Sequence, residues 1–144
     1  MKKIMWVVPI VLTISACYLL REKGSISGKV TNGGTPVSGA IVLALTKDSL
    51  IANESIDYTK LRGALTGSDG NYKIPLVDPG TYYVAAIKDV NSNLLYDPSI
   101  DLIGWYGTRD TISGRVVIPK LVTVESGEET QNINIDTLYT LPGK

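Results

Sequence analysis

SISGKVTNGGTPVSGAIVLAL, residues 25–45, and LTGSDGNYKIPLVDPGTYYVAAIKD, residues 65–89, consist of short segments in which apolar and polar side chains alternate. Each segment ends at Gly, Asn, Asp or Pro. Strict alternation is the period of a half-buried β-strand, and these four residue types favour turns. Both stretches therefore predict short strands that are joined by tight turns.

The same pattern continues along the rest of the chain. Strands are predicted at Ser25–Thr31, Ala40–Thr46, Lys60–Thr66, Tyr72–Leu76, Thr81–Lys88, Arg115–Ile118, Leu121–Val124 and Gln131–Asp136. The second strand is apolar on both faces, which indicates a central position in a sheet. Residues 47–59 are compatible with a short helix or an insertion, and residues 89–107 are predicted to form an acidic, Asn-rich loop. Seven or so short strands separated by turns predict an all-β, seven-stranded Greek-key sandwich.

Four motifs follow one another along these strands. They are I-x-G-x-V at Ile26–Val30, P-V-x-G-A-x-V at Pro36–Val42, T-x-x-D-G-x-Y at Thr66–Tyr72 and P-G-x-Y at Pro79–Tyr82. In this order they resemble the carboxypeptidase regulatory-like, or transthyretin (prealbumin)-like, β-sandwich domain, which implies a prealbumin/Ig-like fold. Tyr82 is expected to form a tyrosine corner, in which its hydroxyl bonds to the backbone. These are structural roles, so the motifs identify a fold rather than an activity.

The first 17 residues have the order of an export signal. Met1-Lys2-Lys3 is basic, residues 4–14 are apolar, and Ile14-Ser15-Ala16 precedes Cys17, the only cysteine of the chain. This order resembles a bacterial lipoprotein signal that ends in a lipobox. The resemblance implies a signal peptide at 1–16, a lipidated Cys17 with a tether at 17–24, a β-domain at 25–137 and a tail at 138–144. Each buried CH₂ of lipid contributes about 0.8 kcal/mol, so two or three chains would hold the domain firmly at a membrane.

Two other interpretations of this segment stay open. One is an ordinary signal peptide with an incidental cysteine. The other is an uncleaved transmembrane helix over residues 4–20, at the short limit for spanning a bilayer and kinked by Pro9. All three place the domain outside the cytoplasm, and the lipid anchor implies a membrane that faces the periplasm or the exterior. Tyr18, where the Gram-negative sorting rule reads Asp as a retention signal, favours the outer membrane in such a host.

Composition excludes several classes of protein. Histidine is absent from the 144 residues, which removes Ser-His-Asp and Cys-His catalysis and histidine ligation of zinc. The hydroxyisourate hydrolase activity of some transthyretin-like proteins depends on histidines and does not carry over. Paired carboxylates remain a catalytic option, but a domain this small rarely encloses the cleft they need, so we expect no enzyme. Without Lys2 and Lys3 the mature chain has 12 basic and 14 acidic side chains, and no basic patch indicates nucleic acid.

The loop that follows the strand Thr81–Lys88 carries oxygen side chains at the spacing of the first part of an EF-hand-type loop. The candidate calcium ligands are Asp89, Asn91, Asn93, the backbone carbonyl of Leu95, Asp97 and Asp101. Leu94 stands where EF-hands have Gly, and Ile100 stands at position 12, so the pattern is incomplete. The alternative is an Asx-rich loop whose side chains bond to its own backbone.

Trp105 and Tyr106 follow this loop, between Gly104 and Gly107. An exposed Trp-Tyr pair can stack on a sugar ring or anchor a protein interface, and the alternative is packing in the core or at its rim. The function expected first is a non-catalytic, lipid-anchored module of the cell envelope with a binding or structural accessory role, stabilised by calcium if the loop binds it. The alternative is a carbohydrate-binding module or a subunit of a surface glycan-handling complex. The expected partners are the membrane, through Cys17, and an envelope protein or glycan.

Overall fold

The computed structural model describes residues 22–47, 62–93, 97–109 and 117–141. The strands of these residues are β1 (Gly24–Lys29), β2 (Thr31–Asn32), β3 (Thr35–Pro36), β4 (Ile41–Leu45), β5 (Arg62–Leu65), β6 (Asn71–Val77), β7 (Gly80–Lys88), β8 (Leu102–Trp105), β9 (Gly107–Arg109), β10 (Val117–Pro119), β11 (Val122–Val124) and β12 (Glu129–Thr130). The prediction of an all-β domain is confirmed for this part of the chain. Within it, no helix is long and apolar enough to cross a membrane. The predicted signal peptide and Cys17 lie outside the described residues.

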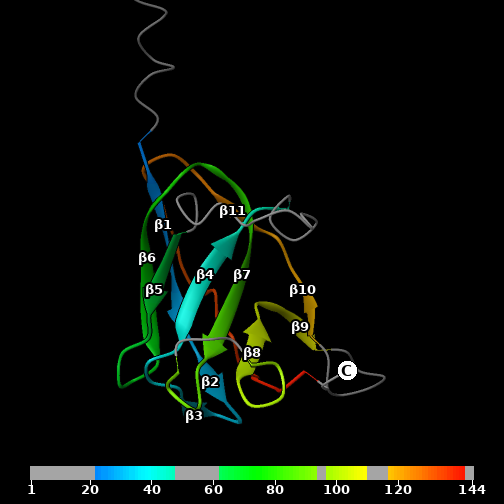
Figure 1. Ribbon diagram of the computed structural model, residues 1–144. Coiled ribbons are helices and arrows are strands. Elements are labelled where there is room, and N and C mark those ends of the chain that lie inside the picture. Colours follow the sequence, from blue (N-terminus) through cyan, green and yellow to red (C-terminus); the bar gives the residue numbers. More distant parts are fainter. Residues whose placement is uncertain (1–21, 48–61, 94–96, 110–116, 142–144) are drawn as a thin grey trace, which may run out of the picture.

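Most of the strands belong to two sheets (Figure 1). The larger sheet has the order β11-β7-β4-β5, with β8 also paired to β7, and the smaller has the order β12-β1-β6. Pairing in both is antiparallel, except that β1 and β12 run parallel. The hairpins β2–β3 and β9–β10 form separate two-stranded ribbons. The position of β4 between β5 and β7 confirms that the second predicted strand is central.

One hydrophobic core joins the two sheets. Ile26 of β1 and Ile74 of β6 are fully buried, as are Val42 of β4 and Val84 of β7, and all four belong to a single cluster. Burying a side chain of this size contributes about 1.5–3 kcal/mol, so these contacts are a main source of stability. The seven-stranded Greek-key order stays a prediction.

The segment after β12 approaches β1 so closely that only glycine fits at position 28. A Cβ atom there would lie 2.1 Å from the carbonyl oxygen of Ile133. The buried Tyr72 hydroxyl donates a hydrogen bond of 2.6 Å to that same oxygen. The backbone N–H of Lys29 donates instead to Oδ1 of Asn134, at 3.0 Å. The close approach of the Ile133 carbonyl to β1 therefore explains why the first motif has a glycine, Gly28, and the third a tyrosine, Tyr72.

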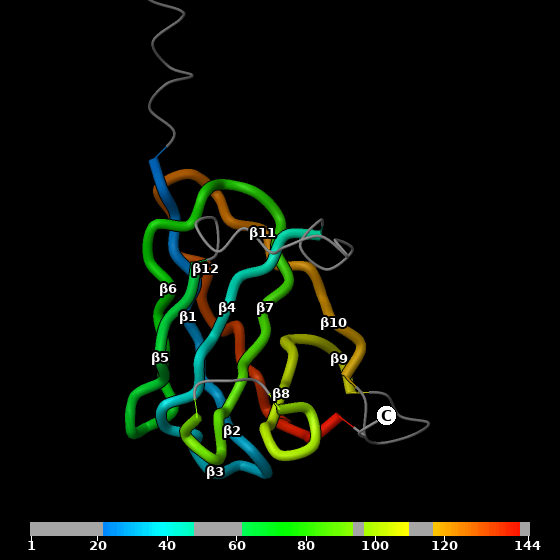
Figure 2. Tube along the Cα trace, in the orientation of Figure 1, coloured from blue at the N-terminus to red at the C-terminus, as the bar shows by residue number. Residues whose placement is uncertain are grey.

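The strand predicted at 131–136 has a different form in the structure. Regular pairing ends at Thr130, but the N–H groups of Ile133 and Ile135 still donate to carbonyls of β1, at 3.0 and 2.9 Å. Ile135 also forms a parallel bridge with Val30, so the segment runs beside β1 (Figure 2). Asn132 has a φ of 62°, outside the β region. The ladder is therefore interrupted, because a left-handed residue and the Asn134 side chain replace its regular bonds.

Two predicted turns are confirmed. Gly70 has a φ of 78°, which costs glycine nothing, and the carboxylate of Asp69 accepts the N–H of Asn71 at 3.0 Å. The Tyr82 hydroxyl donates to the carbonyl of Asp78 at 2.8 Å, which is the expected bond from a tyrosine corner to the backbone.

The predicted loop at 89–107 is wrong at its C-terminal end. Residues 102–105 form β8, which pairs with β7 so that Ile103 lies opposite Ile87. Gly104 is required there, because a Cβ atom would lie 2.4 Å from the carbonyl oxygen of Thr137. Four residues with a central glycine are too few to show alternation, which is why the pattern did not predict this strand.

Replacing Tyr72 with Phe removes the hydroxyl and leaves the carbonyl of Ile133 buried without that donor. We expect the free energy of unfolding to fall by about 1–3 kcal/mol, the cost of an unsatisfied buried polar group. Urea denaturation of the purified protein measures it.

Tyr82→Phe is the matched control, since it removes the same atom from a more exposed site. Water can replace that hydroxyl, so the expected loss is below about 1 kcal/mol. Equal losses for the two variants would contradict the role given to Tyr72.

Candidate functional site

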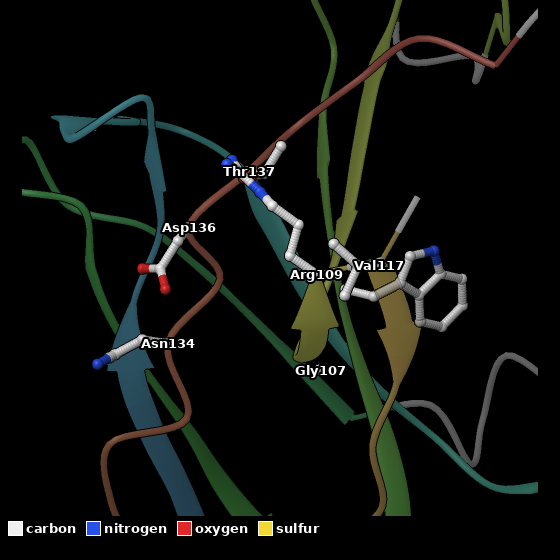
Figure 3. Close-up of a pocket in the computed structure, with 7 residues that line it drawn as sticks. Gly107, Arg109, Val117, Asn134, Asp136 and Thr137 are labelled. Atoms are coloured by element: carbon white, nitrogen blue, oxygen red, sulfur yellow. The ribbon is translucent and has the colours of Figure 1, made fainter. Parts of the chain in front are cut away.

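A pocket of about 200 Å³ lies between the β9–β10 ribbon and residues 134–137 (Figure 3). The residues that line it are Trp105, Gly107, Arg109, Val117, Asn134, Asp136 and Thr137. Pockets for drug-sized ligands measure about 300–1,000 Å³. This pocket is smaller, so it has room for one small ring or one unit of a longer chain.

Arg109 connects the two sides of the pocket. It leaves β9 and its Nη2 donates to the hydroxyl of Thr137 at 2.9 Å, and Figure 3 shows the side chain reaching toward Thr137. A guanidinium has five N–H donors in a fixed plane. The bond to Thr137 uses one of them and orients the group, so further donors remain for a ligand.

Asn134 and Asp136 supply the opposite side. They are two residues apart on an extended segment, and in Figure 3 both project to the side of it that faces away from Trp105. Because a backbone N–H can only donate, the bond from Lys29 must be met by the amide oxygen of Asn134, and its Nδ2 is directed elsewhere. One Asp136 oxygen lies 3.5 Å from the hydroxyl of Thr31, at the limit of a hydrogen bond. The carboxylate therefore keeps most of its capacity as an acceptor.

The structure separates the predicted pair Trp105 and Tyr106, because neighbouring residues of an extended chain point in opposite directions. Tyr106 packs against the core, and its backbone N–H donates to the carbonyl of Val84 at 2.9 Å. Trp105 is half-buried and lines the pocket. Burial raises the pKa of the Tyr139 hydroxyl, and a hydrogen bond with the Trp105 side chain opposes that rise. Of the two aromatic residues, Trp105 is the one at the pocket.

The end of the domain holds this side of the pocket in place. Leu138 is buried in the core cluster, and Tyr139 exchanges two backbone hydrogen bonds of 2.9 Å with Ile103 of β8. Packed structure thus continues past the boundary predicted at residue 137. The segment 134–137 is fixed at both ends, by β1 on one side and β8 on the other.

The carboxylate of Asp101 organises the predicted calcium loop. It is fully buried, and its two oxygens accept the N–H groups of Val90 and Asp97 at 2.9 and 2.8 Å. The carboxylate of Asp97 in turn accepts the hydroxyl and the N–H of Ser99, at 2.6 and 2.9 Å, and these bonds lower the pKa of Asp97. The two acids therefore hold the ends of the loop together through its own backbone.

The other candidate ligands lie at the exposed start of the loop. The N–H of Asn93 is 3.3 Å from an Asp89 oxygen and 3.2 Å from the Asn91 side-chain oxygen. Among the described residues, no three His, Cys, Asp or Glu side chains are grouped so that they could hold a metal ion. Leu95 lies outside that part of the chain. These hydrogen bonds are those of an Asx-rich loop, and calcium binding stays a prediction.

Comparison with known proteins gives a likeness in structure but none in family or curated sequence. No family model and no curated protein matches the chain. The crystal structure of a "putative carbohydrate binding protein (PA1324)" from Pseudomonas aeruginosa is similar at 18% identity, with a TM-score of 0.43, over 86% of this chain and 97% of that one. A likeness at this level does not carry a ligand from one protein to the other.

Sequence reasoning did not find Arg109, Asn134, Asp136 and Thr137. One signal was present in the alternation of the last segment, where Ile133 and Ile135 are buried and the residues between and after them are exposed. Alternation predicts a polar row there, but only the tertiary structure brings that row beside Arg109.

Calcium in the millimolar range is expected to raise the melting temperature by about 3–5 °C at ten times Kd, because a ligand of the folded state stabilises it. Chelator should reverse the rise, and scanning calorimetry measures both. Asp89→Ala should abolish the shift while leaving the chelated protein nearly as stable as before.

Two variants separate ion binding from the internal bonds of the loop. Asp101→Ala leaves two N–H groups without their acceptor, so it should lower the free energy of unfolding by about 3 kcal/mol even in chelator. Asp69→Ala, in the β6 turn, should keep the calcium response. A melting temperature that is flat across the titration would leave the loop as an Asx-rich connection without an ion.

Proposed function

We propose that this chain is a non-catalytic, carbohydrate-binding module of the cell envelope, and that the pocket beside Trp105 is its sugar site. The observation that carries the proposal is the lining of that pocket, which includes one aromatic residue, a guanidinium, an amide and a carboxylate. Each sugar hydroxyl both donates and accepts, and neighbouring hydroxyls match the paired atoms of such planar groups. The apolar face of a sugar ring can pack against an aromatic side chain.

The lining favours binding without cleavage. Glycoside hydrolysis uses two carboxyl groups, about 5–9.5 Å apart, on either side of the bond that breaks. Asp136 is the one acid among the described residues that line the pocket. A bound glycan should therefore leave the protein unchanged.

The resemblance to transthyretin-like domains supports a sandwich as the scaffold. The orders β12-β1-β6 and β11-β7-β4-β5 give three strands and four, which fits a seven-stranded sandwich with β8 as an addition. Three motif residues have specific contacts: Gly28 lies against Ile133, Tyr72 bonds to Ile133, and Tyr82 bonds to Asp78. We therefore propose the prealbumin-like Greek key for this chain.

We further propose that lipid on Cys17 holds the module at a membrane that faces the periplasm or the exterior. The described structure begins at Glu22, and a chain of five residues, the number from Cys17 to Arg21, spans at most about 18 Å when fully extended. Figure 1 shows β1 starting at one end of the domain and β9 lying toward the other. An anchored domain would thus direct the pocket away from the membrane, toward the glycans of the envelope.

A glycan array should identify ligands of the purified protein, and isothermal titration should then give their affinities. Arg109→Ala and Asp136→Ala are each expected to weaken binding about 10- to 100-fold, since a hydrogen bond to a charged group contributes about 1.5–3 kcal/mol. Both side chains are exposed, so the fold should be retained.

Lys47→Ala and Glu125→Ala are the matched controls, because they remove the same charges from exposed positions outside the pocket. They should bind as the unchanged protein does. An array without any bound glycan, or pocket variants with unchanged affinity, would refute the sugar site.

Cys17→Ser tests the anchor. The variant should move from the membrane fraction to the soluble fraction of the producing cells, since serine offers no thiol for lipidation. A variant that stays in the membrane fraction would instead support the transmembrane helix over residues 4–20.

A further inference from the structure

A second concavity, of about 420 Å³, lies along the smaller sheet next to the pocket. It is called the β1 groove here, and the residues that line it are Ser27, Gly28, Lys29, Asn71, Tyr72, Glu129, Gln131, Asn132 and Asn134. Apart from Gly28 and the buried Tyr72, these are half-buried or exposed polar residues. Three strands contribute to it, together with the segment that follows β12.

The charges of the β1 groove are balanced. Lys29 and Glu129 are its charged lining residues. Glu129 forms an ion pair of 2.7 Å with Lys73, and hydrogen bonds from Lys73 and Ser27 lower the pKa of the Glu129 carboxyl. The N–H of Asn71 is the main cause of the lowered pKa of Asp69, and the positive charge of Lys29 lowers that pKa slightly further. A ligand that fits the groove is therefore polar and carries no net charge.

The pocket and the β1 groove meet at Asn134, which lines both. Its amide oxygen is held by the N–H of Lys29, so the amide plane is set by the backbone of β1 before any ligand arrives. The amide oxygen takes the bond from Lys29, so Nδ2 is the group of this side chain that can donate to a ligand. A ligand that extends from one to the other must pass this fixed donor.

We infer that the site takes an extended, uncharged glycan chain, with one sugar in the pocket and the neighbouring sugars along the β1 groove. The inference rests on the function proposed above. An uncharged glycan offers hydroxyls along its whole length, which suits the amide, hydroxyl and balanced charged groups of the groove. Because the groove measures 420 Å³ against 200 Å³ for the pocket, it holds roughly two more units of the size that fills the pocket.

The test is the dependence of affinity on chain length. Linear, uncharged oligosaccharides of one to six units, from the cellulose, chitin and starch series, are titrated calorimetrically into the full protein. At least one series should bind ten or more times tighter at three units than at one, with little gain beyond. Equal affinity for one and three units would overturn the inference and leave the sugar pocket standing, whereas no binding at any length in these series or on the array would remove both.

Two sets of variants place the chain in the groove. Gln131→Ala combined with Asn71→Ala should remove most of the gain with length and leave the single sugar unchanged, while Thr35→Ala on β3 should change neither. Asn134→Asp keeps an oxygen for the N–H of Lys29 but replaces the Nδ2 donor with an acceptor. It should weaken every chain length without changing the melting temperature by more than a few degrees, and a full gain with length in the groove variant would overturn the inference.

Discussion

The carbonyl of Ile133 lies against Gly28 and accepts the hydroxyl of Tyr72, and the rest of this side of the molecule depends on that contact. It fixes the last segment beside β1 although regular strand pairing has ended at Thr130. Beside this contact, the N–H of Lys29 donates to the side chain of Asn134. The backbone of β1 therefore also decides how a residue of the candidate site is oriented.

The same segment is fixed at its other end by β8. Gly104 leaves room for the carbonyl of Thr137, and Leu138 enters the core just beyond it. Both glycines thus mark places where two backbones approach closely, which is a recurrent reason for glycine inside a strand. Between these two contacts, residues 134–137 form a wall that is held at both ends, and Arg109 bonds to it from the other side. Preorganised polar groups lose less entropy when a ligand binds.

Sequence patterns predicted those parts of the structure that are determined by residues close together in the chain. Alternation and turn residues located most of the strands, the central place of β4 and the corner at Tyr82. They did not predict β8, because Gly104 breaks a four-residue pattern for the sake of Thr137, which is more than thirty residues further on. The pocket was not predicted for the same reason. Arg109 and Asp136 are distant in sequence, and local periodicity carries no information on which segments lie side by side in the fold. The loop at 89–101 shows a third limit, because alternating Asp and Asn residues suit both an ion and the backbone of the loop.

Asp101 illustrates how the domain treats polar groups that it buries. Its carboxylate is removed from water, yet each oxygen has a backbone donor, and the buried hydroxyl of Thr66 likewise donates to Val37 and accepts the N–H of Ala40. No buried side-chain polar atom among the described residues lacks a partner. Polar groups that are satisfied internally hold the fold and have little left to offer a ligand. Arg109, Asn134 and Asp136 differ in that respect, because each uses only part of its hydrogen-bonding capacity within the protein and all three line one pocket. That distinction separates the pocket from the other polar clusters of the domain and makes it the place where binding is expected.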